Sequence, residues 1–181
     1  MVIIAFYLVT SSCKNNNKPK VITDILPYTD MLQNDIKTVL TTPTALQLYN
    51  FDTSGKAIDS TIIDTTLFKQ LITTFIQPNI ADSTIKNEYI ESSFEDKDIG
   101  LISFSYDTKN KDLPVKNLIV SFNNGAVKQL KMVLIQKVYT ENKKQVMQQL
   151  CWNVSKFFTI NTTTDSSGIV TNSFKKVTWY L

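Results

Sequence analysis

Paired acidic residues are the nearest approach to a catalytic set in this sequence. Glu91 with Glu95, and Asp59 with Asp64, are close enough along the chain to be considered together. Two carboxyl groups that face each other across a cleft can hydrolyse a glycosidic bond, with one acting as the acid. Nothing in the sequence places either pair in a cleft, and acidic side chains are mostly solvated. A carboxylate-based enzyme is therefore the last of our three hypotheses.

The types of residue that are missing narrow the chemistry further. All 19 basic residues are Lys, no His is present, and the net charge is +3. Without imidazole the chain lacks the usual base of hydrolytic triads and the commonest zinc ligand. Cys151 therefore has no His to activate it, and its apolar surroundings predict a small buried residue in a strand. We therefore predict no enzymatic activity and no cofactor or metal. We also predict no nucleic-acid partner, because the sequence shows no stripe of basic residues.

The N-terminus carries the strongest pattern. Residues 2–9 form an apolar run that is too short for a membrane-spanning helix of about 20 residues. The small residues Thr10, Ser11 and Ser12 follow it, directly before Cys13. A polar segment without periodicity then extends over residues 14–20. This order is typical of a secretory signal followed by a flexible tether.

The junction resembles the lipobox of bacterial lipoproteins. In that family the cysteine receives a diacylglycerol group and the signal is cut directly before it. The resemblance covers residues 2–18 and implies a signal peptide at 1–12, a lipid on Cys13, and a tether at 13–20. Thr10 stands where the family usually has Leu, and no Lys precedes the apolar run, so we expect the true start to lie upstream.

The same resemblance suggests a location. The Thr-, Asn- and Lys-rich sequence is similar to envelope lipoproteins of Bacteroidota-type bacteria. Lys14 follows the cysteine, where retention in the inner membrane uses Asp. No acidic run of the kind that marks surface export follows Cys13. We therefore expect the protein to cross the inner membrane and to be held by its acyl chains in the outer membrane, facing the periplasm.

Residues 21–181 are predicted to form a single α+β domain. Apolar residues at helical spacing predict one helix between Thr29 and Pro43 and another from Asp64 or Thr65 to Pro78. Elsewhere the apolar residues alternate, which predicts strands. The expected strands are residues 46–51, 56–63, 102–106, 118–124, 127–139, 146–154 (running on or bending into 157–160) and 174–180.

The connections predict the topology. Asn124-Gly125 is a strong hairpin signal, residues 141–144 form another turn, and residues 161–168 a polar loop. Residues 79–98 are predicted to hold a short helix near 83–90 and then an exposed loop. Short connections favour an antiparallel meander of about seven strands, with the two helices packed on its buried face.

Two segments could contact a partner, the acidic segment 79–98 and the aromatic C-terminal strands. The side chains that we expect in an interaction surface are Tyr89, Glu91, Phe94, Glu95, Trp179 and Tyr180. Core packing remains the alternative for the aromatic rings. Our first functional hypothesis is a membrane-anchored, non-enzymatic module that binds an envelope protein or component. The second is a carrier or sensor of a lipid or other apolar ligand on the concave face of the sheet.

Overall fold

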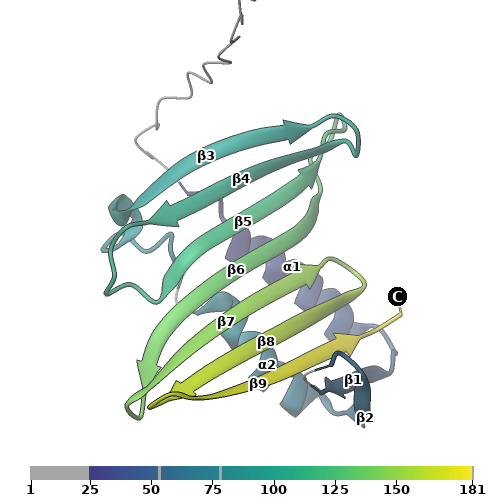
Figure 1. Ribbon diagram of the computed structural model, residues 1–181. Helices are drawn as coiled ribbons and strands as arrows, with labels where there is room; N and C mark the ends of the chain where they lie inside the picture. The colour runs from purple at the N-terminus through teal and green to yellow at the C-terminus, as the bar shows by residue number, and fades with distance from the viewer. Residues whose placement is uncertain (1–24, 53, 78, 181) are drawn as a thin grey trace, which may run out of the picture.

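The computed structural model describes residues 25–52, 54–77 and 79–180. The expected signal peptide, Cys13 and the tether lie outside these residues. Within them the chain forms two α-helices, one short 3-10 helix and nine strands (Figure 1). Their bounds are α1 Tyr28–Thr41, β1 Leu46–Phe51, β2 Ala57–Ile63, α2 Thr65–Ile76, η1 Lys86–Glu88, β3 Tyr89–Asp96, β4 Leu101–Thr108, β5 Val115–Asn123, β6 Leu130–Glu141, β7 Lys144–Asn153, β8 Phe157–Ser166 and β9 Ile169–Thr178.

All of these strands belong to one antiparallel sheet, in the order β2-β1-β9-β8-β7-β6-β5-β4-β3. From β3 to β9 each strand pairs with the next, which is the predicted meander. The β1–β2 hairpin extends the sheet beyond β9, where Leu48 pairs with Val177. The α+β class is confirmed, but the sheet has nine strands rather than about seven.

The two additional strands are β3, which lies in the predicted loop, and β8, which a turn at residues 154–156 separates from β7. The sequence predicts a loop around residues 89–96, but they form the edge strand β3, where charges such as Glu91 and Glu95 are tolerated because one side of the strand has no partner. The predicted helix near 83–90 is reduced to η1. Residues 161–166 are also not a loop but the second half of β8, since Thr favours strands.

Turn geometry explains where the strands reverse. Asn142 and Lys143 have φ of 50° and 65°, so β6 and β7 are joined by a two-residue turn at the predicted place. Ser167 and Gly168 do the same between β8 and β9, with φ of 55° and 89°. The predicted hairpin at Asn124-Gly125 is present, because β5 and β6 pair as antiparallel neighbours, but Gly125 lacks a positive φ and residues 124–129 form a connection longer than two residues.

Both helices lie against the same face of the sheet, as predicted (Figure 1). The Asp64 carboxylate accepts a hydrogen bond of 2.8 Å from the Leu67 amide, which confirms it as the N-cap of α2. Thr29 does not cap α1, which begins one residue earlier, at Tyr28. No helix in the part of the chain that the structure describes is long and apolar enough to cross a membrane.

An aromatic cluster packs between the sheet and α2. Trp152 stacks on Phe158 with ring centroids 5.2 Å apart, and Trp179 lies 5.5 Å from Trp152. From α2, Phe75 meets Trp152 edge-on at 5.3 Å and Phe68 meets Trp179 at 6.0 Å. All five rings are buried. Of the aromatic residues in the C-terminal strands, Trp152, Phe158 and Trp179 therefore serve in core packing.

A buried carboxylate fixes α1 to the same core. Asp35 accepts a hydrogen bond of 2.8 Å from the indole N–H of Trp152. It also accepts bonds from the amide and the hydroxyl of Ser155, in the turn between β7 and β8. The positive φ of Ser155, 61°, brings both of its groups to this carboxylate. No local pattern in the sequence predicts this connection between residues about 120 positions apart.

Candidate functional site

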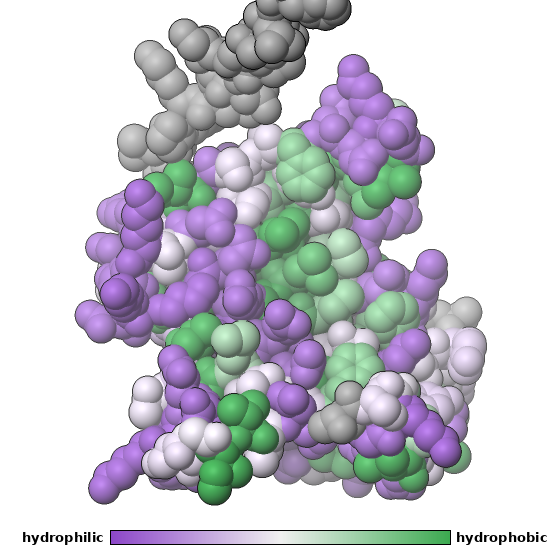
Figure 2. All heavy atoms as spheres, viewed as in Figure 1, coloured by the Kyte–Doolittle hydropathy of each residue, from purple (hydrophilic) through white to green (hydrophobic). Residues whose placement is uncertain are grey.

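Side chains along each strand alternate between the face covered by the helices and an open face. On β7, Leu150 and Trp152 are buried against the helices, whereas Gln149 and Cys151 point to the other side. Both α1 and α2 lie behind the sheet when it is viewed from this open face (Figure 1). Apolar residues gather at the centre of the open face, between hydrophilic margins (Figure 2).

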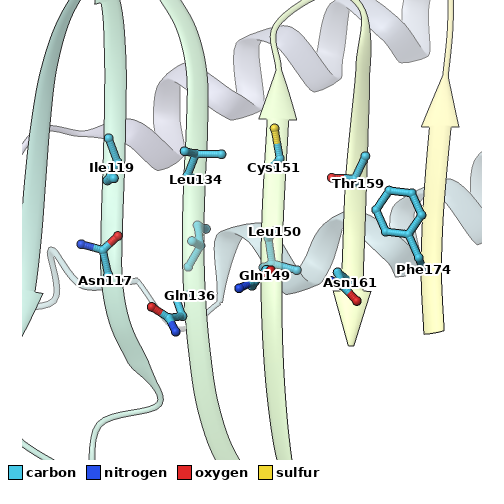
Figure 3. A pocket seen from close by; sticks show the side chains of 11 residues that line it. Asn117, Ile119, Leu134, Gln136, Gln149, Leu150, Cys151, Thr159, Asn161 and Phe174 are labelled. Carbon is cyan, nitrogen blue, oxygen red and sulfur yellow. The ribbon is translucent and has the colours of Figure 1, made fainter. Parts of the chain in front are cut away.

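A hollow of about 360 Å³ lies at this centre and extends from β5 to β9. Its volume is within the range of small-molecule sites, although it is open to solvent on one side. Two parallel rows of side chains line it, running across the strands rather than along them (Figure 3).

The first row is mainly apolar. Strand register places Ile119 beside Leu134, Leu134 beside Cys151, and Cys151 beside Thr159. All four side chains are partly exposed, so they form an apolar surface that water can reach. We call these four residues the apolar row.

The second row consists of amides. Register places Asn117 beside Gln136, Gln136 beside Gln149, and Gln149 beside Asn161, with Phe174 next in line on β9. We call Asn117, Gln136, Gln149 and Asn161 the amide row (Figure 3). Each of four adjacent strands thus contributes one side-chain amide at the same level of the sheet.

Three of these four side-chain amides form no hydrogen bond with the described residues and could bind a ligand. Asn117 donates to Asp107 Oδ1 at 2.7 Å and to Ser105 Oγ at 3.0 Å, so both of its N–H groups are used. The side-chain amides of Gln136, Gln149 and Asn161 form no hydrogen bond with any other described residue. A primary amide has two donors and an accepting oxygen, so these three offer a row of matched donors and acceptors.

A second depression, of about 300 Å³, adjoins the first and shares Asn161 and Phe174 with it. It reaches the β1–β2 turn, where Asp52 lies. That carboxylate accepts hydrogen bonds from Ser54 Oγ and from the Lys56 amide, which lower the pKa of Asp52. The charge is therefore held within its own turn. We call the two depressions together the open-face groove.

Cys151 lies in the hollow and is half-buried rather than fully buried. Burial raises the pKa of its thiol, and the chain has no His that could act as a base. Both facts disfavour the thiolate that a nucleophile requires. Cys151 is better suited to report on the site than to perform chemistry in it.

The acidic pairs do not have the geometry of a glycosidase. Glu91 and Glu95 lie on one strand, four residues apart, which separates their Cα atoms by about 13 Å. Asp64 caps α2 while Asp59 lies on β2. None of the four lines the open-face groove. Within the described ranges no three His, Cys, Asp or Glu side chains come together as metal ligands.

The six residues predicted as an interaction surface are not brought together. Tyr89 is buried, with its hydroxyl donating to the Val115 carbonyl at 3.0 Å, and Trp179 belongs to the aromatic core. Glu91, Phe94 and Glu95 lie on β3 at one edge of the sheet, and Phe94 is 57% exposed.

Tyr180, the sixth of these residues, is 81% exposed directly after β9, so five strands separate it from β3. Sequence reasoning expected an apolar site on one face of the sheet but did not identify the rows of side chains that form the groove. On each of the strands β5 to β8 an amide lies two residues from a member of the apolar row, but only the strand register shows that these pairs align.

Comparison with known proteins adds no relative. No family model matches the chain, and neither a curated protein nor a solved structure matches it. The function must therefore be argued from the site itself.

Proposed function

We propose that this chain is a non-enzymatic binding module, held at a bacterial envelope by a lipid on Cys13, and that it binds its partner with the open-face groove. The observation that carries the proposal is the groove itself, in which an apolar row and a row of unengaged amides lie side by side on the face opposite both helices. A surface of this kind, outside the filled core, is a candidate for recognition.

The chemistry of the lining supports binding rather than catalysis. The 11 residues that line the first hollow include no carboxylate, no Lys and no His. The remaining reactive group, the Cys151 thiol, is disfavoured as a nucleophile by its raised pKa. Amides and apolar side chains recognise and orient a ligand but supply no general acid or base.

The anchor is tested separately from the binding face. Cells that express the full chain should incorporate labelled palmitate into it, and the variant Cys13→Ala should lose the label. The processed protein should fractionate with the outer membrane and resist protease added to intact cells. Palmitate labelling that survives Cys13→Ala would contradict the proposed anchor.

A carrier of a lipid or other apolar ligand is the second candidate. The observation in its favour is the apolar floor made by Ile119, Leu134 and Phe174. The aromatic core occupies the space between the sheet and α2, so an acyl chain would have to lie in the open-face groove. Native mass spectrometry of the protein from envelopes should then show a lipid bound in addition to the anchor.

Occupancy of the groove can be measured through Cys151. We expect a small thiol reagent to modify Cys151 at least five times more slowly in intact envelopes than in the purified protein, because a bound ligand covers the hollow. Mass spectrometry of the peptide that contains Cys151 separates this signal from Cys13.

A matched control comes from the same strand and the same face. The double variant Cys151→Ser with Gln145→Cys moves the thiol to an exposed position on β7 outside the groove. Its thiol should react at the same rate in both preparations. Equal rates for Cys151 itself in envelopes and in purified protein would overturn the proposed binding face.

A further inference from the structure

We propose that the open-face groove binds a neutral oligosaccharide, laid across the strands with its sugar rings over the apolar row and its hydroxyl groups on the amide row. This inference rests on the proposed function, because it names the ligand class of the same face.

The ligand should be uncharged, because the first hollow carries no charged side chain. Lys176 is next to Thr159 in register, but its Nζ lies 4.6 Å from the centroid of the Phe157 ring and it does not line the hollow. An anionic ligand would find no partner there, and desolvating an unpaired charge is costly. The one carboxylate of the second depression, Asp52, is already hydrogen-bonded within its turn.

The ligand should also be rich in hydroxyl groups. The free amides of Gln136, Gln149 and Asn161 each donate and accept, and a hydroxyl group does both as well. An acyl chain over this row would bury the amides without hydrogen-bond partners, which is unfavourable. The amide row therefore disfavours a lipid and favours a ligand with regularly spaced polar groups.

Sugar rings also match the apolar part of the groove. One side of a pyranose ring presents mainly C–H groups, which pack against aromatic and aliphatic side chains. Leu134 and Phe174 supply such surfaces, and the Phe174 ring is supported by Phe51, whose centroid is 4.9 Å away. The two rows thus provide both kinds of contact that a sugar requires.

The dimensions of the groove suit a chain of sugars. Adjacent strands are about 4.8 Å apart, so the four steps from β5 to β9 span about 19 Å. The length of one sugar in an extended oligosaccharide is close to the strand spacing, which allows one amide to serve one sugar. The second depression continues the groove beyond Phe174.

A peptide is less well matched to this surface. Extended peptides are usually recognised by backbone hydrogen bonds to a free strand edge. Here the groove crosses the middle strands β5 to β8, whose backbone groups pair with neighbours on both sides. Recognition on this face therefore depends on side chains alone.

The test uses the full chain with Cys13→Ser, in which Cys151 is the only thiol. Its alkylation rate is measured with neutral tetrasaccharides of glucose, mannose and N-acetylglucosamine, with tetragalacturonate, with palmitate, and with a capped tetra-alanine peptide. We expect at least one neutral tetrasaccharide to slow the reaction five-fold or more at millimolar concentration, and the other three classes to leave it unchanged.

Variants then locate the site. Gln149→Ala should weaken the protecting tetrasaccharide about five- to ten-fold, which corresponds to one lost hydrogen bond of about 1–1.4 kcal/mol. Gln145→Ala, on the same strand and face but outside the groove, should leave the affinity unchanged. Circular dichroism would show that both variants remain folded.

Each contrary outcome has a definite meaning. Protection by palmitate, by tetragalacturonate or by the peptide alone, or by no probe, would overturn the saccharide assignment. So would tetrasaccharide protection that Gln149→Ala leaves intact. If Cys151 is nevertheless protected in envelopes, the binding module stands and only the ligand class is wrong, so the two failures are distinguishable.

Discussion

The two faces of the sheet differ although they are built from alternate residues of the same strands. On β7, Trp152 is fully buried against α1 and α2, whereas its neighbour Cys151 is half-buried in an open hollow. The covered face holds the aromatic core and the Asp35 contacts, while the open face holds the amide row. Stability is thus concentrated on one face, which leaves the other free to carry a binding surface.

The largest effect on stability should come from replacing, one at a time, two neighbouring residues of β7 that face opposite sides of the sheet. Trp152→Ala should lower the free energy of unfolding by about 3–5 kcal/mol, because it removes a ring packed against Phe158, Phe75 and Trp179. Cys151→Ala should change it by less than about 1 kcal/mol. Urea unfolding followed by circular dichroism measures both. Similar losses for the two variants would contradict the division between the faces.

The next effect concerns the carboxylate that fixes α1 to the covered face. Asp35→Ala should cost about 2–4 kcal/mol, because the Trp152 indole and the Ser155 amide and hydroxyl all lose their acceptor. Asn34→Ala, at the adjacent exposed position of α1, should cost less than about 0.5 kcal/mol. The same unfolding assay compares the two variants. A cost for Asp35→Ala no greater than that of the control would show that these hydrogen bonds contribute little.

A smaller effect should appear as a pH dependence of the covered face. Lys137 is buried, and its Nζ donates to the carbonyl of Thr74 in the last turn of α2 and to that of Gln77, the C-cap residue of the helix. Burial lowers the pKa of Lys137 from 10.5 to about 8. Between these values the unfolded chain binds a proton that the folded chain does not, so the free energy of unfolding rises with pH. We expect a rise on the order of 2 kcal/mol, from about pH 8 towards pH 10.

The test for this rise compares Lys137→Met with natural Lys137, both in a Cys151→Ser background. Burial raises the pKa of the Cys151 thiol, so its ionisation in the unfolded chain would otherwise lower the stability above about pH 8.5. Without this thiol, the Lys137→Met variant should have nearly constant stability from pH 7 to 9.5, since no His titrates and the lysine is gone. Measurements stop there because burial raises the pKa of Tyr89 to about 12, and that of Tyr106 further, so both destabilise the fold once unfolded tyrosines ionise above pH 10. A rise that persists in Lys137→Met would assign it to another group.

The covered face was largely predictable from the sequence, because apolar spacing is a local property. The period of 3.6 residues around Phe68, Ile72 and Phe75 predicted α2, and its Asp64 cap was identified as one of two candidates. β3 and the second half of β8 were missed because polar residues follow one another in them, Glu and Ser in β3 and Thr and Asn in β8, so that no apolar alternation marks them. Residues 157–160 were predicted as strand, but the turn that separates them from β7 was not.

The open-face groove could not be predicted in this way. Its rows run across the strands, so neighbours such as Leu134 and Cys151 meet only through the register of β6 with β7. Register depends on turn geometry, and the turn at Asn142 and Lys143 sets it here. The Asp35 contacts were missed for a similar reason, because they depend on the positive φ of Ser155.

The smallest effect belongs to the open face, away from the groove. Ser103 and Ser121 pair directly between β4 and β5, are both buried, and have hydroxyl oxygens 2.8 Å apart. Ser103→Ala or Ser121→Ala alone should cost about 1 kcal/mol, because each leaves a buried hydroxyl without its partner. The double variant should cost no more than either single one, because replacing both partners removes the unpaired group as well.

A double-mutant cycle measures this coupling, which should be about 1 kcal/mol, above the 0.3–0.5 kcal/mol within which independent sites add. The result bears on the comparison of the faces because a coupled pair would mean that this part of the open face is held by a polar contact rather than by apolar packing. Strictly additive losses would instead mean that each serine is stabilised by its own surroundings. The contact between the two hydroxyl groups would then contribute little to holding β4 and β5 together on the open face.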